Sequence, residues 1–237
     1  MITELHDIIS KSNNIVFFGG AGVSTESGIP DFRSVDGLYN ENYKHPPETI
    51  ISHSFFIKYP EEFFNFYIEK MIFLNVKPNA AHIKLAQLEA KDKLKAVITQ
   101  NIDGLHQAAG SKNVLELHGS VHRNYCMKCG KFYSVQYIID SKPVPKCTCG
   151  SIIKPDVVLY EESLNEEIIE NSIKYIKNAE VLIIGGTSLV VYPAAGLINY
   201  FNGNKLVLIN KSATSLDSRA DLVINESIGK VFENIKL

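Results

Sequence analysis

Short apolar runs rich in β-branched residues recur along the chain and predict buried strands. They occupy residues 15–18, 96–99, 114–117, 157–159, 181–184, 206–209 and 222–224. Several of these runs show no alternation of polar and apolar positions, which is typical of strands covered by helices on both faces. The pattern therefore predicts a parallel sheet in the middle of the fold.

Three segments between these runs have the apolar spacing of amphipathic helices, namely residues 80–90, 166–177 and 193–201. The dipeptide Pro78-Asn79 precedes the first of them and is a helix-start signal. Because strands and helices alternate, we expect an α/β fold with a doubly wound, Rossmann-like parallel sheet.

Two segments interrupt this alternation. Residues 35–77 are aromatic-rich and helical in pattern, with no clear strand, and residues 123–153 hold all four cysteines together with several prolines and glycines. We interpret both as inserts in a single domain over residues 1–237. Its core would comprise residues 1–34, 78–122 and 154–237, with a helical insert at 35–77 and a cysteine-containing insert at 123–153.

Composition excludes several classes of protein. A chain of 237 residues, 45% of them hydrophobic, fits one globular body. Its 26 acidic and 24 basic residues give a net charge of −2, so we expect neither a nucleic acid nor a membrane as partner. No apolar run approaches the roughly 18 residues of a membrane helix. Residues 1–13 lack the pattern of a secretory signal, so we expect a cytoplasmic protein, and nothing suggests more than a monomer.

The four cysteines form two close pairs, Cys126 with Cys129 and Cys147 with Cys149, separated by 17 residues. Two disulfides are one interpretation. In a reducing compartment this spacing favours four thiolates around one structural, tetrahedral Zn²⁺ ion per chain. The second pair is Cys-Thr-Cys, one residue tighter than Cys-x-x-Cys, which places more strain on a tetrahedral site.

A glycine-rich loop, Gly19-Gly20-Ala21-Gly22-Val23-Ser24, directly follows the first predicted strand. Glycines at this point of a Rossmann unit let backbone amides approach a pyrophosphate at a helix N-terminus. Thr25 stands where the third glycine of the usual fingerprint would be, so a simple tight turn is the alternative.

Small and polar residues also follow two later strands. Gly186, Thr187 and Ser188 come after residues 181–184, and Asn210 comes after residues 206–209. Because ligands of open α/β sheets lie beyond the carboxyl ends of the strands, Thr187, Ser188 and Asn210 are candidates for binding an adenosine ribose. The alternative is that Ser188 and Asn210 only cap turns.

Two further motifs make the pattern specific to one family. Thr99-Gln100-Asn101-Ile102-Asp103-Gly104-Leu105-His106 and Leu117-His118-Gly119-Ser120 each end at or follow a predicted strand. Alone, the histidine could be a packed residue and Asn-Ile-Asp a helix cap. Together with the glycine loops, Gly28-Ile29-Pro30-Asp31-Phe32-Arg33, the four cysteines and Lys154-Pro155-Asp156-Val157-Val158, they resemble the sirtuins, which are NAD-dependent protein-lysine deacylases. The motifs occur in the family's order and cover nearly the whole chain.

The resemblance implies a set of site residues. His118 resembles the catalytic base, Phe32 the side chain that shields the reacting ribose, and Asn101 with Asp103 the pair that orients the nicotinamide amide. Val157, Val158 and Val190 lie on segments that, in the family, clamp an extended substrate backbone by strand addition. The full set of implied NAD contacts is Gly20, Ala21, Gly22, Ser24, Thr25, Asp31, Phe32, Arg33, Gln100, Asn101, Ile102, Asp103, Gly186, Thr187, Ser188 and Asn210.

The resemblance also implies the chemistry, with NAD as co-substrate and acyl-lysine proteins or peptides as partners. In the family scheme the acyl oxygen attacks the ribose C1′ and nicotinamide departs. A base then draws a proton from a ribose hydroxyl, which attacks the bound imidate. A neutral imidazole suits this step because its ordinary pKa, about 6.5, lies near working pH. The products would be the deacylated lysine, nicotinamide and O-acetyl-ADP-ribose.

Two departures from the family pattern concern the substrate groove. Tyr160-Glu161-Glu162 replaces the more usual Phe-Gly-Glu at its edge. Lys70 stands three residues after Tyr67, where sirtuins that prefer succinyl or malonyl groups carry an arginine. A lysine lacks the planar fork that binds a carboxylate, so we expect acetyl to be favoured.

Two other functions stay open at this point. One is an ADP-ribosyltransferase that uses the same cofactor pocket, and the other is a non-catalytic, zinc-containing binding module.

Overall fold

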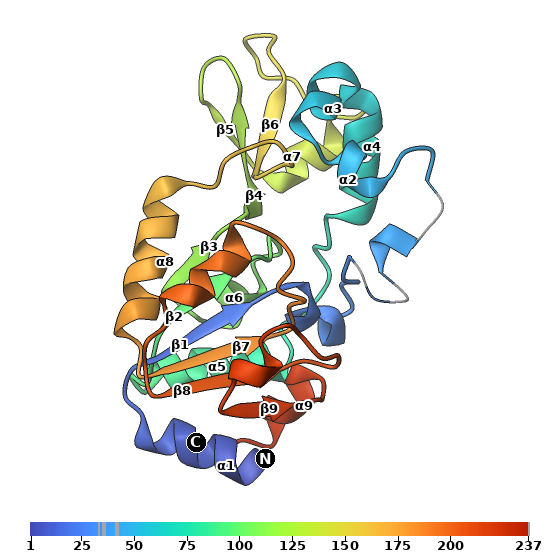
Figure 1. The fold of residues 1–237 in the computed structure, drawn as a ribbon. Coiled ribbons are helices and arrows are strands. Elements are labelled where there is room, and N and C mark those ends of the chain that lie inside the picture. The colour runs from blue at the N-terminus through green and yellow to red at the C-terminus, as the bar shows by residue number, and fades with distance from the viewer. Residues whose placement is uncertain (33, 35–36, 41–42, 237) are drawn as a thin grey trace.

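Six parallel strands form the central sheet of the larger lobe (Figure 1). The computed structural model describes residues 1–32, 34, 37–40 and 43–236. Across the sheet the strands run in the order β3 (Val114–Glu116), β2 (Leu94–Thr99), β1 (Ile15–Gly19), β7 (Val181–Gly185), β8 (Lys205–Ile209) and β9 (Leu222–Ile224). From β1 the chain proceeds to β2 and β3 on one side, and later from β7 to β8 and β9 on the other. The sheet therefore has a topological switch point between β1 and β7.

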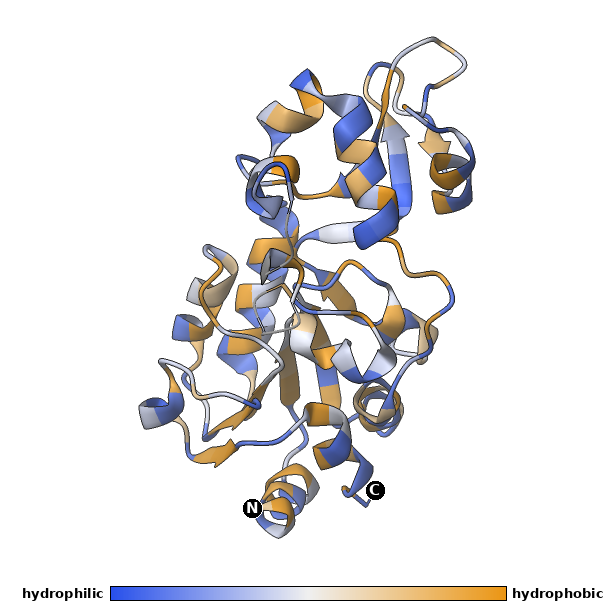
Figure 2. Cartoon of the chain, turned by 90° about the vertical axis from the view of Figure 1, so that its right-hand side faces the viewer, coloured by the Kyte–Doolittle hydropathy of each residue, from blue (hydrophilic) through white to orange (hydrophobic). Residues whose placement is uncertain are grey.

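Helices cover both faces of this sheet. Ile15 and Phe17 of β1 pack toward α1 (Ile2–Lys11), α5 (Ala80–Ala90) and α9 (Ile228–Glu233), whereas Val16 and Phe18 pack toward α8 (Glu166–Asn178) and the 3₁₀ helix η4 (Ala194–Tyr200). Strand side chains alternate between the faces, so a strand with two buried faces is apolar throughout. Figure 2 shows this as hydrophobic strands in the middle of the larger lobe. The predicted α/β class with a parallel sheet is confirmed.

A smaller lobe is built from both inserts together with residues 119–122 and 154–157, which lie outside the predicted bounds of the cysteine-containing insert. Its antiparallel sheet has the order β5 (Phe132–Tyr133), β4 (Gly119–Cys126) and β6 (Ile153–Val157). Side chains from the helical and cysteine-containing inserts, such as Phe56, Phe63 and Ile138, lie in one hydrophobic cluster. The helices of this lobe are α2 (Pro47–Ile50), α3 (His53–Lys58), α4 (Pro60–Lys70) and α7 (Val135–Asp140); short elements elsewhere are η1 (Ala21–Val23), η2 (Thr25–Ser27), η3 (Leu38–Asn40), α6 (Leu105–Ala108) and η5 (Asp217–Arg219).

Most predicted elements are present, and one strand was predicted wrongly. α5 has the predicted bounds because the Asn79 side chain accepts a hydrogen bond from the Ala81 N–H and caps the helix. The run 157–159 was predicted as a buried strand, but the strand is β6, which ends at Val157 and pairs antiparallel with β4. An apolar run indicates that its side chains are buried, but it does not indicate where a strand ends or which strand it pairs with, and this explains the error. The helix predicted at 193–201 is a 3₁₀ helix.

In the described part of the chain, no helix has the length and apolar character to cross a membrane.

Candidate active site

The loops that follow β1 and β7 touch at the switch point of the sheet. Gly20 donates its N–H to the Gly185 carbonyl at 3.3 Å, and Gly22 donates to the Gly186 carbonyl at 2.8 Å. A Cβ atom on Gly22 would lie 2.8 Å from the Gly186 Cα, so a side chain there would force the loops apart. These glycines allow a close approach of two backbones at the sheet edge where α/β proteins bind ligands.

Polar side chains tie the end of β2 to the ends of β7 and β8. The Gln100 amide nitrogen donates to the Thr187 hydroxyl at 3.2 Å. Asn210 accepts from the Thr187 N–H and donates to the Thr187 carbonyl, both at 3.0 Å. Asn210 thus holds the backbone of Thr187, and its side chain has one more amide hydrogen and one more lone pair that could bind a ligand. Ser188 is exposed beside this pair.

Ser24, Asn101 and Asp103 form a second hydrogen-bonded group. The Ser24 hydroxyl donates to Asp103 Oδ2 at 2.7 Å and accepts from the Asn101 amide nitrogen at 3.0 Å. Asp103 Oδ1 accepts from the Leu105 N–H at 2.8 Å, which is also the bond expected of a helix cap. Ser24 and Asn101 are buried, so the group is fixed in place and offers an amide and a carboxylate in one spot.

His118 lies between the two sheets, after β3 and directly before β4. Its Nδ1 atom is 3.0 Å from the Gln100 carbonyl oxygen. Because a carbonyl can only accept, Nδ1 carries the proton and the neutral ring leaves Nε2 as the proton acceptor. Burial lowers the pKa of His118 below its ordinary value of 6.5, while the bond to Gln100 acts in the opposite direction. The half-buried ring is therefore held as a neutral imidazole.

Two residues of the predicted substrate groove lie next to His118 in the backbone. Val158 donates its N–H to the His118 carbonyl at 3.0 Å, and Val157 is buried at the end of β6. Val190, after β7, is 55% exposed. At the groove edge, the hydroxyls of Tyr160 and Tyr39 are 3.0 Å apart, and the Tyr39 ring packs on Phe32 at 5.5 Å between centroids.

The remaining predicted cofactor residues occupy loops around the same edge. Thr25 donates its hydroxyl to the Gly22 carbonyl at 3.1 Å, and Asp31 accepts from the Ser34 N–H at 2.7 Å. The Ile102 carbonyl accepts from the Val121 N–H at 3.0 Å. Ala21 begins η1 and is half-buried. Arg33 lies outside the described residues.

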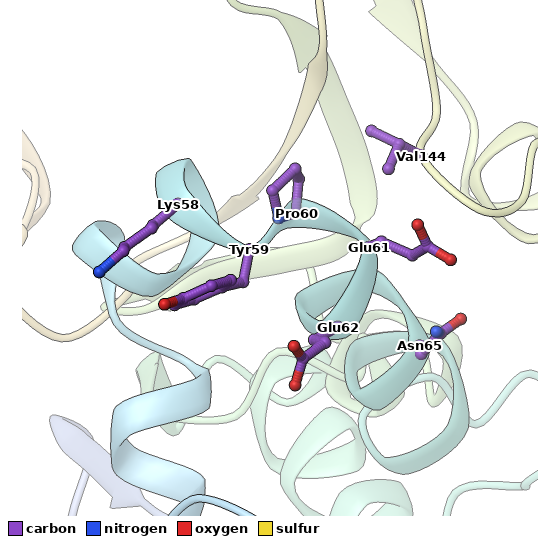
Figure 3. Close-up of a pocket in the computed structure, with 7 residues that line it drawn as sticks. All are labelled: Lys58, Tyr59, Pro60, Glu61, Glu62, Asn65 and Val144. Carbon is purple, nitrogen blue, oxygen red and sulfur yellow. The ribbon is translucent and has the colours of Figure 1, made fainter.

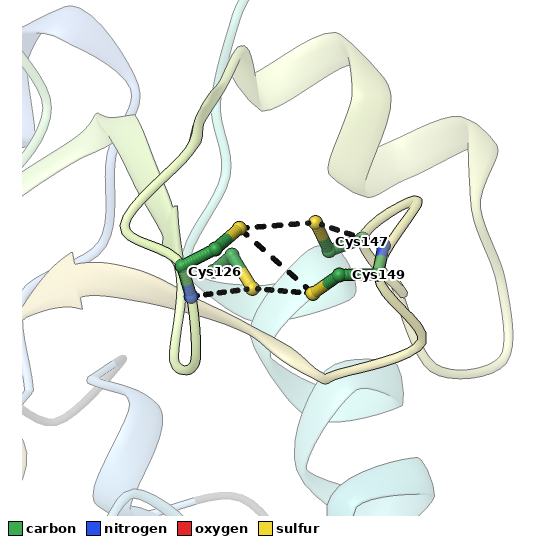
Figure 4. A group of neighbouring side chains, drawn as sticks. Cys126, Cys147 and Cys149 are labelled. Atoms are coloured by element: carbon green, nitrogen blue, oxygen red, sulfur yellow. Dashed lines mark hydrogen bonds between the residues drawn. The ribbon is translucent and has the colours of Figure 1, made fainter.

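The four cysteines meet in the smaller lobe (Figure 4). Cys126 ends β4, whereas His118 directly precedes that strand. All four Sγ atoms lie within 4.8 Å of one another, and Cys126 is 3.5 Å from Cys149 while Cys129 is 3.6 Å from Cys147. Sulfurs at the corners of a tetrahedron around zinc lie about 3.8 Å apart. The backbone N–H groups of Cys129 and Cys149 point at the sulfurs of Cys126 and Cys147, which suits thiolates. The tight Cys-Thr-Cys spacing therefore still fits a zinc ion.

Sequence reasoning missed a buried histidine pair behind the Ser24 group. The rings of His82 and His106 are 4.7 Å apart, and both side chains are essentially inaccessible. His82 Nδ1 accepts from the Asn79 N–H, and the Asn79 amide donates to the Val23 carbonyl, which anchors α5 to the glycine-rich loop. The signal in the sequence was a histidine at the third position of a helix that starts at Asn79.

One surface groove lies away from these residues. It has a volume of about 530 Å³ and runs between the α3–α4 junction and Val144; Figure 3 shows Lys58, Tyr59 and Glu61 among its lining. It contains none of the predicted site residues. The linked polar groups at the sheet edge, and not this groove, have the chemistry of a cofactor site.

Comparisons with known proteins show which family the chain resembles. The model of the Sir2 family matches residues 20–193. The NAD-dependent protein deacetylase of Clostridium acetobutylicum is 65% identical over 238 residues, which cover 99% of this chain and 97% of the relative. The enzyme of the same description from Clostridium perfringens is 67% identical, covering 99% and 98%.

Solved structures of Sir2 proteins are also similar to this chain. A Sir2 variant in complex with a deacetylated p53 peptide and 3′-O-acetyl ADP ribose is similar to this chain with a TM-score of 0.91 and 41% identity, covering 99% of this chain and 96% of that one. A complex of Sir2 with a p53 peptide and NAD⁺ gives a TM-score of 0.88 at 41% identity, covering 99% and 97%.

Proposed function

The chain belongs to the Sir2 family and is an NAD-dependent protein deacetylase, and we propose that His118 is its general base. The observation that carries this proposal is the Nδ1 bond to the Gln100 carbonyl, which leaves Nε2 as the acceptor. In the second stage of the reaction, His118 Nε2 would take the proton from a ribose hydroxyl that attacks the substrate-derived imidate.

NAD is the co-substrate, and we propose that it binds across the carboxyl ends of β1, β2 and β7. The glycine-rich loop at residues 20–24 would lie against the pyrophosphate, and Gln100 and Thr187 would lie against the riboses. Asn101 and Asp103 would orient the nicotinamide amide, because an amide and a carboxylate match the donors and acceptors of a carboxamide. Zn²⁺ has a structural role: held by Cys126, Cys129, Cys147 and Cys149, it cross-links the smaller lobe.

We propose that an acetyl-lysine peptide binds as an added strand along Val157–Val158 and Val190, with its acyl group directed toward His118. The backbone bond from Val158 to His118 supports this placement. A small neutral acyl group is favoured because Lys70 lies 3.4 Å from Glu69 and 5.8 Å from the Tyr43 ring, and Tyr67 is fully buried. A succinyl-lysine peptide should therefore react more slowly than its acetyl counterpart.

We propose further that residues 1–237 act as one catalytic domain, with inserts at 35–77 and 123–153, in a cytoplasmic monomer. The hydrophobic cluster shared by the two inserts supports a single smaller lobe. Light scattering of the purified protein at micromolar concentration should give the mass of one chain, 26.4 kDa. A stable dimer would contradict the monomer.

The decisive experiment is incubation with an acetyl-lysine peptide and NAD. We expect nicotinamide and O-acetyl-ADP-ribose as products, whereas ADP-ribose attached to protein would indicate transfer instead. In parallel, His118→Ala should bind NAD with near-native affinity and lose deacetylation by roughly 100-fold or more. Near-normal deacetylation by the folded variant would remove His118 from the mechanism.

A further inference from the structure

Arg123, on β4, connects the two sheets through a pair of carboxylates. Its Nη1 donates to Glu116 Oε2 at 2.6 Å, and its Nε donates to Asp156 Oδ2 at 2.7 Å. Glu116 is the last residue of β3 in the large sheet, whereas Asp156 lies on β6 in the small sheet. One guanidinium thus joins the edge strand of the larger lobe to a strand of the smaller lobe.

Burial makes this network energetically significant. The Glu116 side chain is only 7% exposed, whereas Arg123 and Asp156 are about two-fifths exposed. A carboxylate as buried as Glu116 must be paired, and short hydrogen bonds between charged groups are the strong class of such pairs. Asp156 can lose its charge without leaving a buried ion unpaired, because Arg123 and Glu116 still pair with each other.

Two members of the network, Glu116 and Arg123, flank His118 in the sequence. Glu116 precedes His118 by two residues, and Gly119 begins β4 with φ +75°, where an added Cβ would lie 1.9 Å from the Asp156 carbonyl oxygen. The His118 carbonyl accepts the Val158 N–H. The base-bearing segment is therefore in direct backbone contact with the segment proposed to bind substrate.

The strand ladder is interrupted where Arg123 acts. β4 and β6 pair through Ser120 with Asp156 and then through Asn124 with Pro155, so the register shifts between these pairs. Residues 121–123 have no direct partner on β6 in this ladder. Bulges of this kind re-aim side chains and often occur beside active sites. In this gap the Arg123 guanidinium supplies the connection that the backbone ladder does not.

We propose that Arg123 is a positioning residue which, through Glu116 and Asp156, fixes His118 relative to the substrate-binding segment at Val157–Val158. The proposal rests on the role of His118 proposed above. Catalysis is sensitive to displacements of about 1 Å, which can cost roughly 100-fold in rate. Departure of nicotinamide precedes the step that needs the base, so loosening the network should slow deacetylation more than nicotinamide exchange.

The test compares these two rates in Asp156→Asn at saturating NAD and peptide. This variant keeps the Arg123–Glu116 pair and the size of the side chain. We expect deacetylation to fall roughly tenfold, nicotinamide exchange to stay within about threefold and the KM for NAD within about twofold. Arg123→Lys, which keeps the charge but loses the planar fork, should shift the ratio of the two rates in the same direction.

Asp221→Asn is the matched control. The Asp221 carboxylate also links two strands, since it accepts from Lys205 Nζ and from the Leu206 N–H, but it lies between β8 and β9. Its removal should leave the ratio of the two rates unchanged. An unchanged ratio in Asp156→Asn and Arg123→Lys would overturn the proposal, even if the melting temperature fell. So would a proportional loss of both rates. His118→Ala, measured alongside, separates the proposals: if it retains deacetylation, the assigned base is wrong instead.

Discussion

The protonation state of His118 sets the acid limit of the reaction. A general base works only when unprotonated, so the rate falls as pH falls through its pKa. Burial lowers the pKa of His118, and the neutral ring therefore persists below the ordinary value of 6.5. We expect the acid limb of kcat/KM for the acetylated peptide to lie below pH 6.5, measured as a pH–rate profile. An acid limb centred above pH 7 would contradict this environment for the base.

At the same scale, Asn101 and Asp103 should control the response to nicotinamide. Asn101→Ala removes a buried amide that donates to Ser24, and Asp103→Ala removes the acceptor of the Ser24 hydroxyl. Each loss should weaken nicotinamide inhibition and exchange roughly tenfold. Asn113→Ala is a suitable control, because the Asn113 amide donates to the Lys95 carbonyl near the start of β2, at the opposite end of that strand from Gln100. Unchanged inhibition in both test variants would assign Asn101 and Asp103 to helix capping.

Among the elements, the turn after β6 contains a residue in an unfavourable backbone conformation. Glu161 has φ +74°, a conformation that disfavours residues with a Cβ. Its carboxylate accepts from the N–H and the hydroxyl of Ser54, at 2.8 and 2.9 Å, which offsets that cost. Both Glu161→Ala and Glu161→Gly lose these bonds, but only glycine relieves the backbone. The alanine variant should therefore be less stable than the glycine variant by about 1 kcal/mol in urea unfolding. Equal stabilities would show that this backbone is unstrained.

The cysteine cluster should determine the stability of the smaller lobe. Cys126 and Cys147 are buried in the same hydrophobic cluster as Phe63 and Tyr133, so loss of the metal exposes a core shared by both inserts. Cys126→Ser or strong chelation should lower the melting temperature and the zinc content from about one per chain, with activity lost only as the fold is lost. Met127→Ser, at an exposed position between the ligands, is the control. A zinc-free protein of normal stability would disprove the structural role.

For the whole molecule, the buried histidines predict loss of stability in acid. Burial lowers the pKa of His82 to about 4, against an opposing effect of Asp103, and that of His106 to about 3, with His82 adding to the effect. In the unfolded chain both titrate near 6.5. Above that pH neither state binds these protons. As pH falls from 6.5 toward 4, the unfolded state gains them first, and each histidine lowers the free energy of unfolding by up to about 1.4 kcal/mol per pH unit.

Urea unfolding at pH 7 and pH 5 measures this effect. The wild type should lose stability over that interval, and His106→Phe, which can pack against Phe17 in the same space, should lose less. His6→Asn, at a more exposed position in α1, is the control and should behave as the wild type. Equal losses in His106→Phe and the wild type would contradict the neutral, buried state of His106.

The sequence by itself determined the features that local pattern encodes. Unbroken apolar runs such as residues 181–184 specified strands buried on both faces, and Asn79 specified the start of α5. Only the tertiary structure decided which distant partners meet. It paired β6 with β4 instead of the central sheet, joined the two inserts in one core, and brought Arg123 to Glu116 and Asp156, 7 and 33 residues away. Periodicity reports whether a side chain is buried, but its partner depends on how strands and lobes pack, which no local window of sequence contains.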